Sequence, residues 1–98
     1  MPLPEPKRES LVERHLVDRV RRLGGKAYKW VSPANRGVPD RLVILPGNRA
    51  FCVECKAPGR RLTPLQENQV AQLKLLGVEV FVAASREDVN RILREARL

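Results

Sequence analysis

The sequence predicts one α/β domain in which helices pack on a mixed four-stranded sheet. The chain has 98 residues, which is enough for one hydrophobic core but not for two. Segments with helical periodicity stand near both ends of the chain, and short apolar segments typical of strands lie between them. We expect the order αβββαβα, with a loose, proline-rich lead-in at residues 1–8 and a single domain over residues 9–98.

The first helix is expected from Arg8 to Leu23, where apolar residues recur at helical spacing until the Gly24-Gly25 pair ends them. At about 100° per residue, Glu9 and Glu13 fall within the apolar arc of this helix. A buried carboxylate is costly unless a cation, a metal or a donor compensates it. As an alternative, Glu9 lies in the first turn and only favours the helix dipole.

Three strands should follow. We expect them at residues 26–31, 40–45 and 49–56, with a loop at 32–37 and a tight turn at 46–48, whose sequence is PGN. This turn predicts that the second and third strands form an antiparallel hairpin.

A second helix is predicted after the loop that follows the third strand. Thr63 and Gln66 fit a capping box, and Pro64 suits the first helical position. The helix should end near Leu76, before Gly77. A fourth strand is expected at 78–83 and a last helix at 86–96, capped by Ser85. A helical crossover between the third and fourth strands favours parallel pairing, so the sheet should be mixed.

The charge balance indicates an anionic partner. Nineteen Lys and Arg against eleven Asp and Glu give a net charge of +8, which attracts phosphate polymers through steering and counterion release. Nucleic acid is the first candidate and an acidic membrane surface the second. No apolar run approaches the roughly 20 residues of a membrane span, and the N-terminus has no signal-peptide pattern. We expect a soluble, intracellular protein.

The two cysteines are not expected to bind metal or form a redox pair. Cys52 and Cys55 stand three positions apart in an expected strand, so that their side chains point to opposite faces. A closed zinc site needs about four ligands, and the chain has one histidine, His15, to which we assign no role. Both thiols are expected to act as small buried hydrophobes.

The third strand carries two charged residues that its apolar neighbours do not explain. Glu54 and Lys56 share one side of it, and the hairpin should bring Asp40 roughly opposite residues 54–56. Two carboxylates this close repel each other, and a divalent cation such as Mg²⁺ relieves the repulsion, with waters and substrate phosphate completing its shell. Lys56 could then orient the attacking water or offset charge on the phosphate. These residue types fit phosphodiester hydrolysis.

The same residues resemble a known signature. Pro39-Asp40 and Glu54-x-Lys56 match the P-D-x(n)-(D/E)-x-K pattern of the restriction-endonuclease-like nucleases, whose core order is αβββαβ. The segments R-G-V-P-D at 36–40, V-E-C-K-A-P-G-R at 53–60, T-P-L-Q at 63–66 and G-V-x-V at 77–80 resemble the VRR-NUC (virus-type replication-repair nuclease) family. The likeness covers about residues 9–90.

The resemblance implies a metal site and its catalytic cation. Mg²⁺ or Mn²⁺ would be held by Asp40, by Glu54 and by the backbone carbonyl of Cys55, with Lys56 as the catalytic cation. Each role has a structural rival: Asp40 could be a turn residue after Gly-x-Pro, and Glu54 with Lys56 could be an exposed pair on an edge strand.

The family also implies a glutamate on the first helix and a glutamine near the site. Glu13 fits the glutamate best by its offset from the glycine stop, and Glu9 is the alternative. Gln66 matches the glutamine, although it could be only the capping-box acceptor, and Gln69 also falls on the apolar side.

Basic and aromatic residues are expected around the site. The aromatic residues Tyr28 and Trp30 could stack on bases or pack in the core. The basic residues, which could hold phosphates or be solvated surface, are Lys29, Arg36, Arg41, Arg60 and Arg61.

The combined hypothesis is a Mg²⁺- or Mn²⁺-dependent DNA endonuclease that is selective for branched DNA such as Holliday junctions. Small stand-alone members of the family, from phages and bacteria, act as homodimers, which implies a homodimer in the cytoplasm of a bacterial or phage-infected cell. The alternative is a non-catalytic, basic DNA-binding module of the same fold. A membrane-surface or protein-interaction domain would leave Asp40, Glu54 and Lys56 without a purpose.

Overall fold

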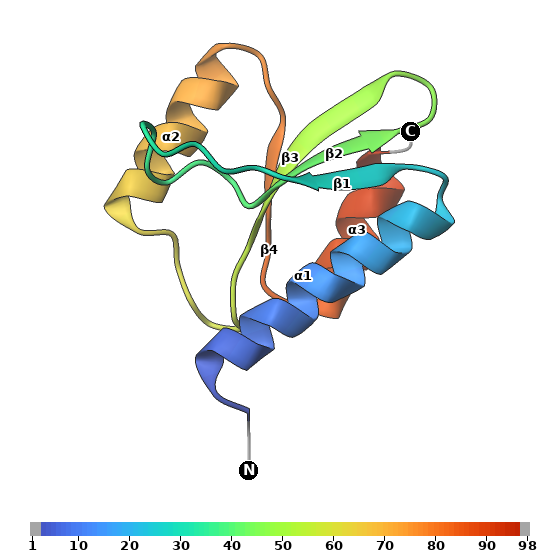
Figure 1. Ribbon diagram of the computed structural model, residues 1–98, viewed down its shortest axis with the longest axis horizontal. Coiled ribbons are helices and arrows are strands. Elements are labelled where there is room, and N and C mark those ends of the chain that lie inside the picture. The colour runs from blue at the N-terminus through green and yellow to red at the C-terminus, as the bar shows by residue number, and fades with distance from the viewer. Residues whose placement is uncertain (1–2, 97–98) are drawn as a thin grey trace.

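A computed structural model describes residues 3–96, and within them the predicted order αβββαβα is confirmed (Figure 1). The helices are α1 (Glu5–Arg22), α2 (Pro64–Leu75) and α3 (Arg86–Ala96), and the strands are β1 (Lys26–Lys29), β2 (Arg41–Leu45), β3 (Arg49–Cys55) and β4 (Val80–Ala83).

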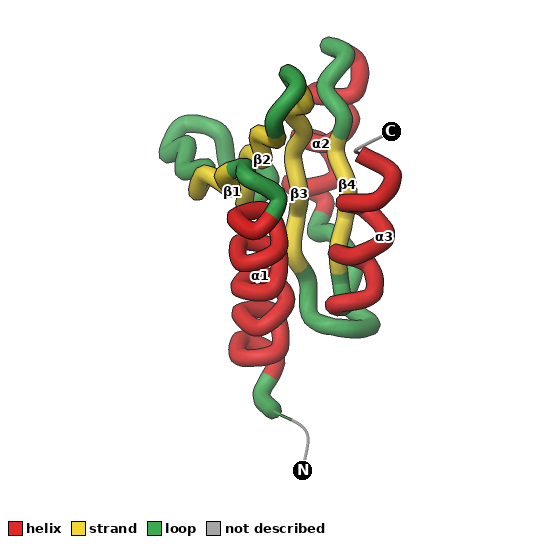
Figure 2. The backbone as a smooth tube through the Cα atoms, turned by 90° about the vertical axis from the view of Figure 1, so that its right-hand side faces the viewer, coloured by secondary structure: helices red, strands yellow, loops and turns green. Residues whose placement is uncertain are grey.

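The four strands form one mixed sheet in the order β1-β2-β3-β4. β2 pairs antiparallel with both β1 and β3, whereas β3 and β4 are parallel, as the helical crossover through α2 predicts. α1 and α3 cover one face of the sheet, and α2 lies against the other (Figure 2). The sheet therefore carries two helices on one face and one helix on the other.

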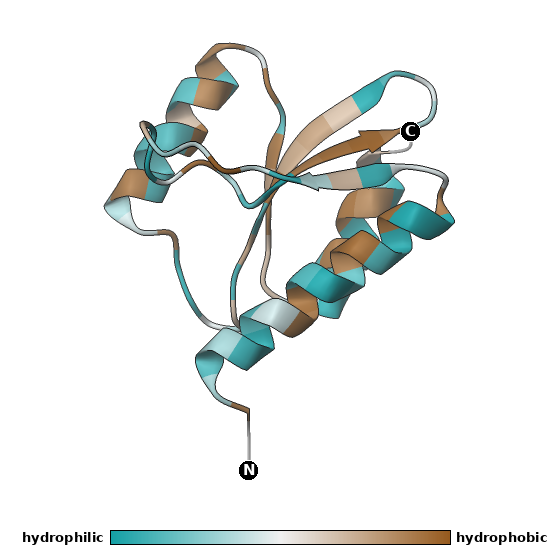
Figure 3. Ribbon diagram, in the orientation of Figure 1, coloured by the Kyte–Doolittle hydropathy of each residue, from teal (hydrophilic) through white to brown (hydrophobic). Residues whose placement is uncertain are grey.

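The core is concentrated on the α1/α3 face. Its cluster joins Leu16 and Val20 of α1, Phe51 of β3, and Ile92 and Leu93 of α3, all fully buried. Apolar and polar residues alternate along α1 and α3 (Figure 3), and the buried apolar ones belong to this cluster. A smaller cluster lies under α2, and the two thiols are divided as expected: Cys55 is buried in the large cluster and Cys52 in the small one.

Helix α1 begins earlier than the sequence suggests. It starts at Glu5 rather than near Arg8, and Pro6 lies in its first turn, where a missing backbone N–H breaks no hydrogen bond. Residues 5–8 are thus helical rather than loose, and the part of the lead-in at residues 1–2 lies outside the described residues.

The second helix has the predicted start. Thr63 is its N-cap, and both hydrogen bonds of the capping box with Gln66 are present. The third helix is capped as expected, because the Asp88 N–H donates to Ser85 Oγ at 3.0 Å. Within residues 3–96, no helix combines the length and the apolar character that crossing a membrane would require.

Candidate functional site

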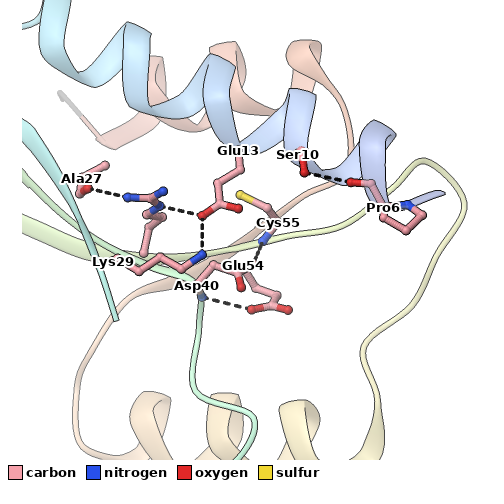
Figure 4. A network of polar contacts seen from close by, with 9 residues as sticks. Pro6, Ser10, Glu13, Ala27, Lys29, Asp40, Glu54 and Cys55 are labelled. Atoms are coloured by element: carbon pink, nitrogen blue, oxygen red, sulfur yellow. Dashed lines mark hydrogen bonds and ion pairs between the residues drawn. The ribbon is translucent and has the colours of Figure 1, made fainter. Parts of the chain in front are cut away.

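Asp40 and Glu54 meet where the β2–β3 hairpin opens. The last paired residues are Arg41 and Val53, and one step further the Asp40 N–H donates to Glu54 Oε1 at 3.2 Å (Figure 4). The Cys55 N–H donates in turn to Asp40 Oδ2 at 2.8 Å. The two carboxyl groups therefore lie side by side, with Glu54 held by the backbone of Asp40 and Asp40 held by the backbone of Cys55.

The turn at the far end of the hairpin explains this register. Gly47 and Asn48 both adopt left-handed backbone conformations, with φ of 85° and 63°, which glycine and asparagine tolerate best. The tight reversal pairs Leu45 with Arg49, and counting outward from this pair brings Asp40 opposite Glu54. The expectation that Asp40 lies roughly opposite residues 54–56 is confirmed.

A glycine brings the approach to Asp40 close to helix α2. Gly37 has a φ of 91°, and a Cβ on it would lie 2.6 Å from the backbone carbonyl of Leu65. Only glycine fits this contact, and Pro39, which follows it, is fully buried. The segment before β2 is thereby fixed against the first turn of α2, and Asp40 with it.

Among the described residues, Glu54 is the one charged residue that is buried, with 2% of its surface exposed. β3 is an interior strand, so the interpretation of Glu54 and Lys56 as an exposed pair on an edge is wrong. Burial, and then the nearby charge of Asp40, raise the pKa of Glu54 to about 8, against a smaller lowering by Lys56. The Glu54 carboxyl thus resists ionisation unless more positive charge arrives.

Lys56 and Gln66 both approach Glu54 Oε2. The Lys56 ammonium lies 3.8 Å from this oxygen, and the Gln66 side-chain amide donates to it at 2.6 Å. The Gln66 carbonyl oxygen is already engaged, because it accepts from the Thr63 N–H at 2.9 Å. The capping box of α2 therefore turns the NH₂ group of Gln66 toward Glu54, and the two roles considered for Gln66 coexist.

The two candidate glutamates of α1 have different neighbours. Glu13 accepts from Arg41 Nε at 2.7 Å and from Lys29 Nζ at 3.2 Å (Figure 4). Glu9 lies one turn nearer the N-terminus, where burial and then the charge of Asp40 raise its pKa, while Lys56 lowers it. Glu13 is thus compensated by two cations, whereas Glu9 lies within electrostatic reach of Asp40.

The five basic candidates have three kinds of surroundings. Lys29 and Arg41 bind Glu13, and Arg41 Nη1 also donates to the carbonyl of Ala27 at 3.1 Å. Arg60 forms a 3.2 Å ion pair with Glu5, which links the loop after β3 to the start of α1. Arg36 and Arg61 are exposed on their loops.

The donor groups at this site suit a hard divalent cation. Two carboxylates lie together, one of them buried and reluctant to ionise, and carboxylate and carbonyl oxygens are the ligands that Mg²⁺ and Mn²⁺ prefer. Within residues 3–96, no three His, Cys, Asp or Glu side chains gather around one point. A two-carboxylate site is common for Mg²⁺, which keeps several waters and binds substrate phosphate.

Comparison with known proteins gives two informative relatives, whereas no family model matches the chain. The chain is 54% identical over 86 residues to a protein named "Putative nuclease p44" from Acyrthosiphon pisum secondary endosymbiont phage 1, with 88% of this chain and 91% of that protein covered. A solved structure described as "VRR_NUC domain" superposes with a TM-score of 0.83 at 30% identity, covering 89% of this chain and 95% of the other.

Proposed function

Since the chain belongs to the VRR-NUC family and has the restriction-endonuclease-like α/β fold, we propose that it is a metal-dependent DNA endonuclease. The observation that carries this proposal is the pairing of Asp40 with the buried Glu54, with Lys56 and Gln66 both directed at Glu54. A fold without chemistry has no need for a buried carboxyl next to a second one, because that arrangement costs stability.

Asp40 and Glu54 would hold Mg²⁺ or Mn²⁺, together with the backbone carbonyl of Cys55. When bound, the ion supplies the positive charge that activates water and stabilises negative charge on the phosphate. Gln66 keeps Glu54 Oε2 in place by donating to it, the Asp40 N–H donates to Glu54 Oε1, and the Cys55 N–H donates to Asp40 Oδ2. The protein thus orients both carboxylates before substrate arrives.

Lys56 supplies the second positive charge at this place. Its side chain is largely buried, and its ammonium lies beside Glu54. It can donate hydrogen bonds to the attacking water and to a phosphate oxygen, where negative charge grows in the transition state. Water adds to phosphorus and the bond to one bridging oxygen breaks, which leaves one strand end with a phosphate and the other with a hydroxyl.

Glu9 is the glutamate of α1 that we assign to the site. Burial and then the charge of Asp40 raise its pKa, and Lys56 lowers it, whereas Glu13 is engaged by Lys29 and Arg41. Glu13 instead positions these two cations, to which we assign binding of substrate phosphates. This assignment replaces the preference for Glu13 that its offset from the glycine stop suggested.

The preferred substrate is proposed to be branched DNA, such as a four-way junction, cut by a homodimer. The net charge of +8 suits a phosphate polymer, and Arg36, Arg60 and Arg61 lie on loops of the described chain where phosphates can reach them. A four-way junction has two-fold symmetry, so a C2 dimer would present one site to each of two strands.

The proposal is tested by cleavage of a labelled four-way junction, a flap and plain duplex, with Mg²⁺, Mn²⁺ or EDTA. We expect cutting that requires a divalent ion, prefers the junction, and falls by at least about 10²-fold in Glu54→Ala while DNA binding persists. Glu79→Ala is the matched control, because Glu79 is a half-exposed carboxylate paired with Arg49.

Equal cutting by Glu54→Ala and the unaltered chain would contradict the site. Binding of all three DNAs without any cutting would favour the non-catalytic module. Sedimentation velocity of the same samples tests the dimer, since a single monomeric species at micromolar concentration would contradict it.

A further inference from the structure

An apolar pocket of about 260 Å³ opens on the α2 face of the sheet. Tyr28, Trp30, Leu42 and Cys52 line it from the sheet side, and Leu73 closes it from α2. Nearly all of its lining is carbon, yet it is not filled by the core, because Tyr28 remains 46% exposed. The site described above does not use it.

The pocket lies directly beside the carboxylates on the same face of the sheet. Tyr28 pairs with Leu42, and Leu42 with Cys52, so these residues form one row across three strands. The next row on the same face contains Trp30, whose backbone N–H donates to the backbone carbonyl of Asp40 at 3.0 Å. Because two residues along a strand span about 7 Å, the pocket begins about one nucleotide away from Asp40 and Glu54.

The lining and its charges suit a nucleobase of DNA. Aromatic side chains provide flat surfaces on which an unpaired base stacks regardless of its sequence. The cation nearby is Lys26, whose Nζ lies 4.7 Å from the centre of the Tyr28 ring. A second copy seated here across a two-fold axis would bring the Lys26 side chains of both chains together, which is unfavourable.

On these grounds, and resting on the proposed nuclease function, we propose that the pocket receives an unstacked base next to the phosphate held at Asp40 and Glu54. Such a base is available in single-stranded or gapped DNA and at a branch point, whereas in paired duplex its extraction costs a few kcal/mol. The pocket then contributes to the preference for DNA that is not fully paired.

Trp30 makes the proposal directly measurable, because it is the only tryptophan of the 98 residues. The full chain is titrated in EDTA with a gapped duplex and with a fully paired duplex of the same length, while its fluorescence and the DNA anisotropy are recorded. We expect gapped DNA to quench Trp30 in step with binding, and paired duplex to bind with little quenching.

A substitution series separates stacking from general binding. Tyr28→Ala should weaken affinity for the gapped DNA by about 10-fold and leave affinity for paired duplex nearly unchanged, and Tyr28→Phe should restore the gapped affinity. Leu75→Ala is the matched control, because Leu75 is 88% exposed and does not line the pocket.

The inference is overturned if Tyr28→Ala binds both DNAs with the affinity of the unaltered chain. It is also overturned if the Trp30 fluorescence changes with protein concentration and does not distinguish gapped from paired DNA, as contact with a second copy would require. Cutting in Mg²⁺ without quenching in EDTA would remove the base pocket and keep the nuclease. Quenching by gapped DNA without cutting in Mg²⁺ would support the pocket and contradict the nuclease.

Discussion

The two faces of the sheet differ in how many apolar side chains they bury. Among residues 3–96, fourteen buried apolar residues form one cluster on the α1/α3 face, whereas three do so under α2. The second face also carries the buried Glu54 and the open apolar pocket. Since burial of apolar surface is the main source of stability, the first face holds the fold together, and the second is free to carry groups that cost stability.

Helix α2 shows the same contrast with α3. Helix α3 buries four residues, Val89, Ile92, Leu93 and Ala96, while α2 buries Val70 and leaves Leu75 at its end 88% exposed. The contribution of α2 to the site lies at its start, where the capping box directs the Gln66 amide toward Glu54. Its position matters more to the site than to the core.

The largest expected effect is a difference in the stability lost when a side chain is truncated on one face of the sheet or on the other. Phe51→Ala removes a fully buried ring that packs edge-on against Phe81, 5.4 Å between centroids, and should lower the free energy of unfolding by about 3–5 kcal/mol. Leu73→Ala, on the α2 face, should cost only about 1 kcal/mol because Leu73 is half-buried. Urea unfolding of both variants measures the difference, and equal losses would contradict the contrast.

The second prediction separates a glycine needed for the site from one needed only for its own turn. Gly37→Ala and Gly47→Ala both place a side chain at positive φ, but only at Gly37 does the new Cβ meet backbone atoms. Each should lose about 1 kcal/mol to backbone strain, and Gly37→Ala should lose more because its Cβ would meet the backbone of Leu65. Gly37→Ala should also slow junction cleavage by about 10-fold or more, since it shifts Asp40 relative to Gln66.

Cleavage rates under saturating Mg²⁺, compared with unfolding energies, test this pair. If Gly47→Ala slows cleavage as much as Gly37→Ala does, the contact between the turn and α2 has no special role in positioning Asp40.

A further prediction is a dependence of stability on pH in the absence of divalent ions. The pKa of Glu54 is raised from 4.5 to about 8 in the folded chain, so between these values the folded state keeps a proton that the unfolded chain releases. Stability from this group is therefore full below about pH 4.5 and is lost as pH rises to about 8. Glu54→Gln should flatten this part of the profile.

Urea unfolding in EDTA at about pH 5, 6.5 and 8 measures the slope, with Glu79→Gln as the exposed control. An unchanged slope in Glu54→Gln would show that the proton is not held by Glu54.

Much of the fold follows from the sequence because its signals are local. Thr63 and Gln66 specify the start of α2, and the glycine-containing turn at 46–48 fixes the register that brings Asp40 opposite Glu54. The same register explains why the convergence of these two carboxyls could be predicted. Their catalytic roles, and that of Lys56, stay predictions.

Other features depend on distances that the pattern does not contain. Helical periodicity places Glu9 and Glu13 on one side of α1, but Lys29 and Arg41, which bind Glu13, come from two strands. The close approach of Gly37 to α2 and the pocket beside Trp30 arise from how α2 sits on the sheet, which its weakly amphipathic sequence does not specify.

The most direct test of the account is calorimetric titration of Mn²⁺ into the unaltered chain and into Glu54→Gln at about pH 7.5, without DNA. The account predicts that the unaltered chain binds Mn²⁺ and releases protons as Glu54 ionises, and that Glu54→Gln binds at least about 10-fold more weakly with little proton release. Equal affinity and equal proton release in both proteins would contradict a cation site between these two carboxylates.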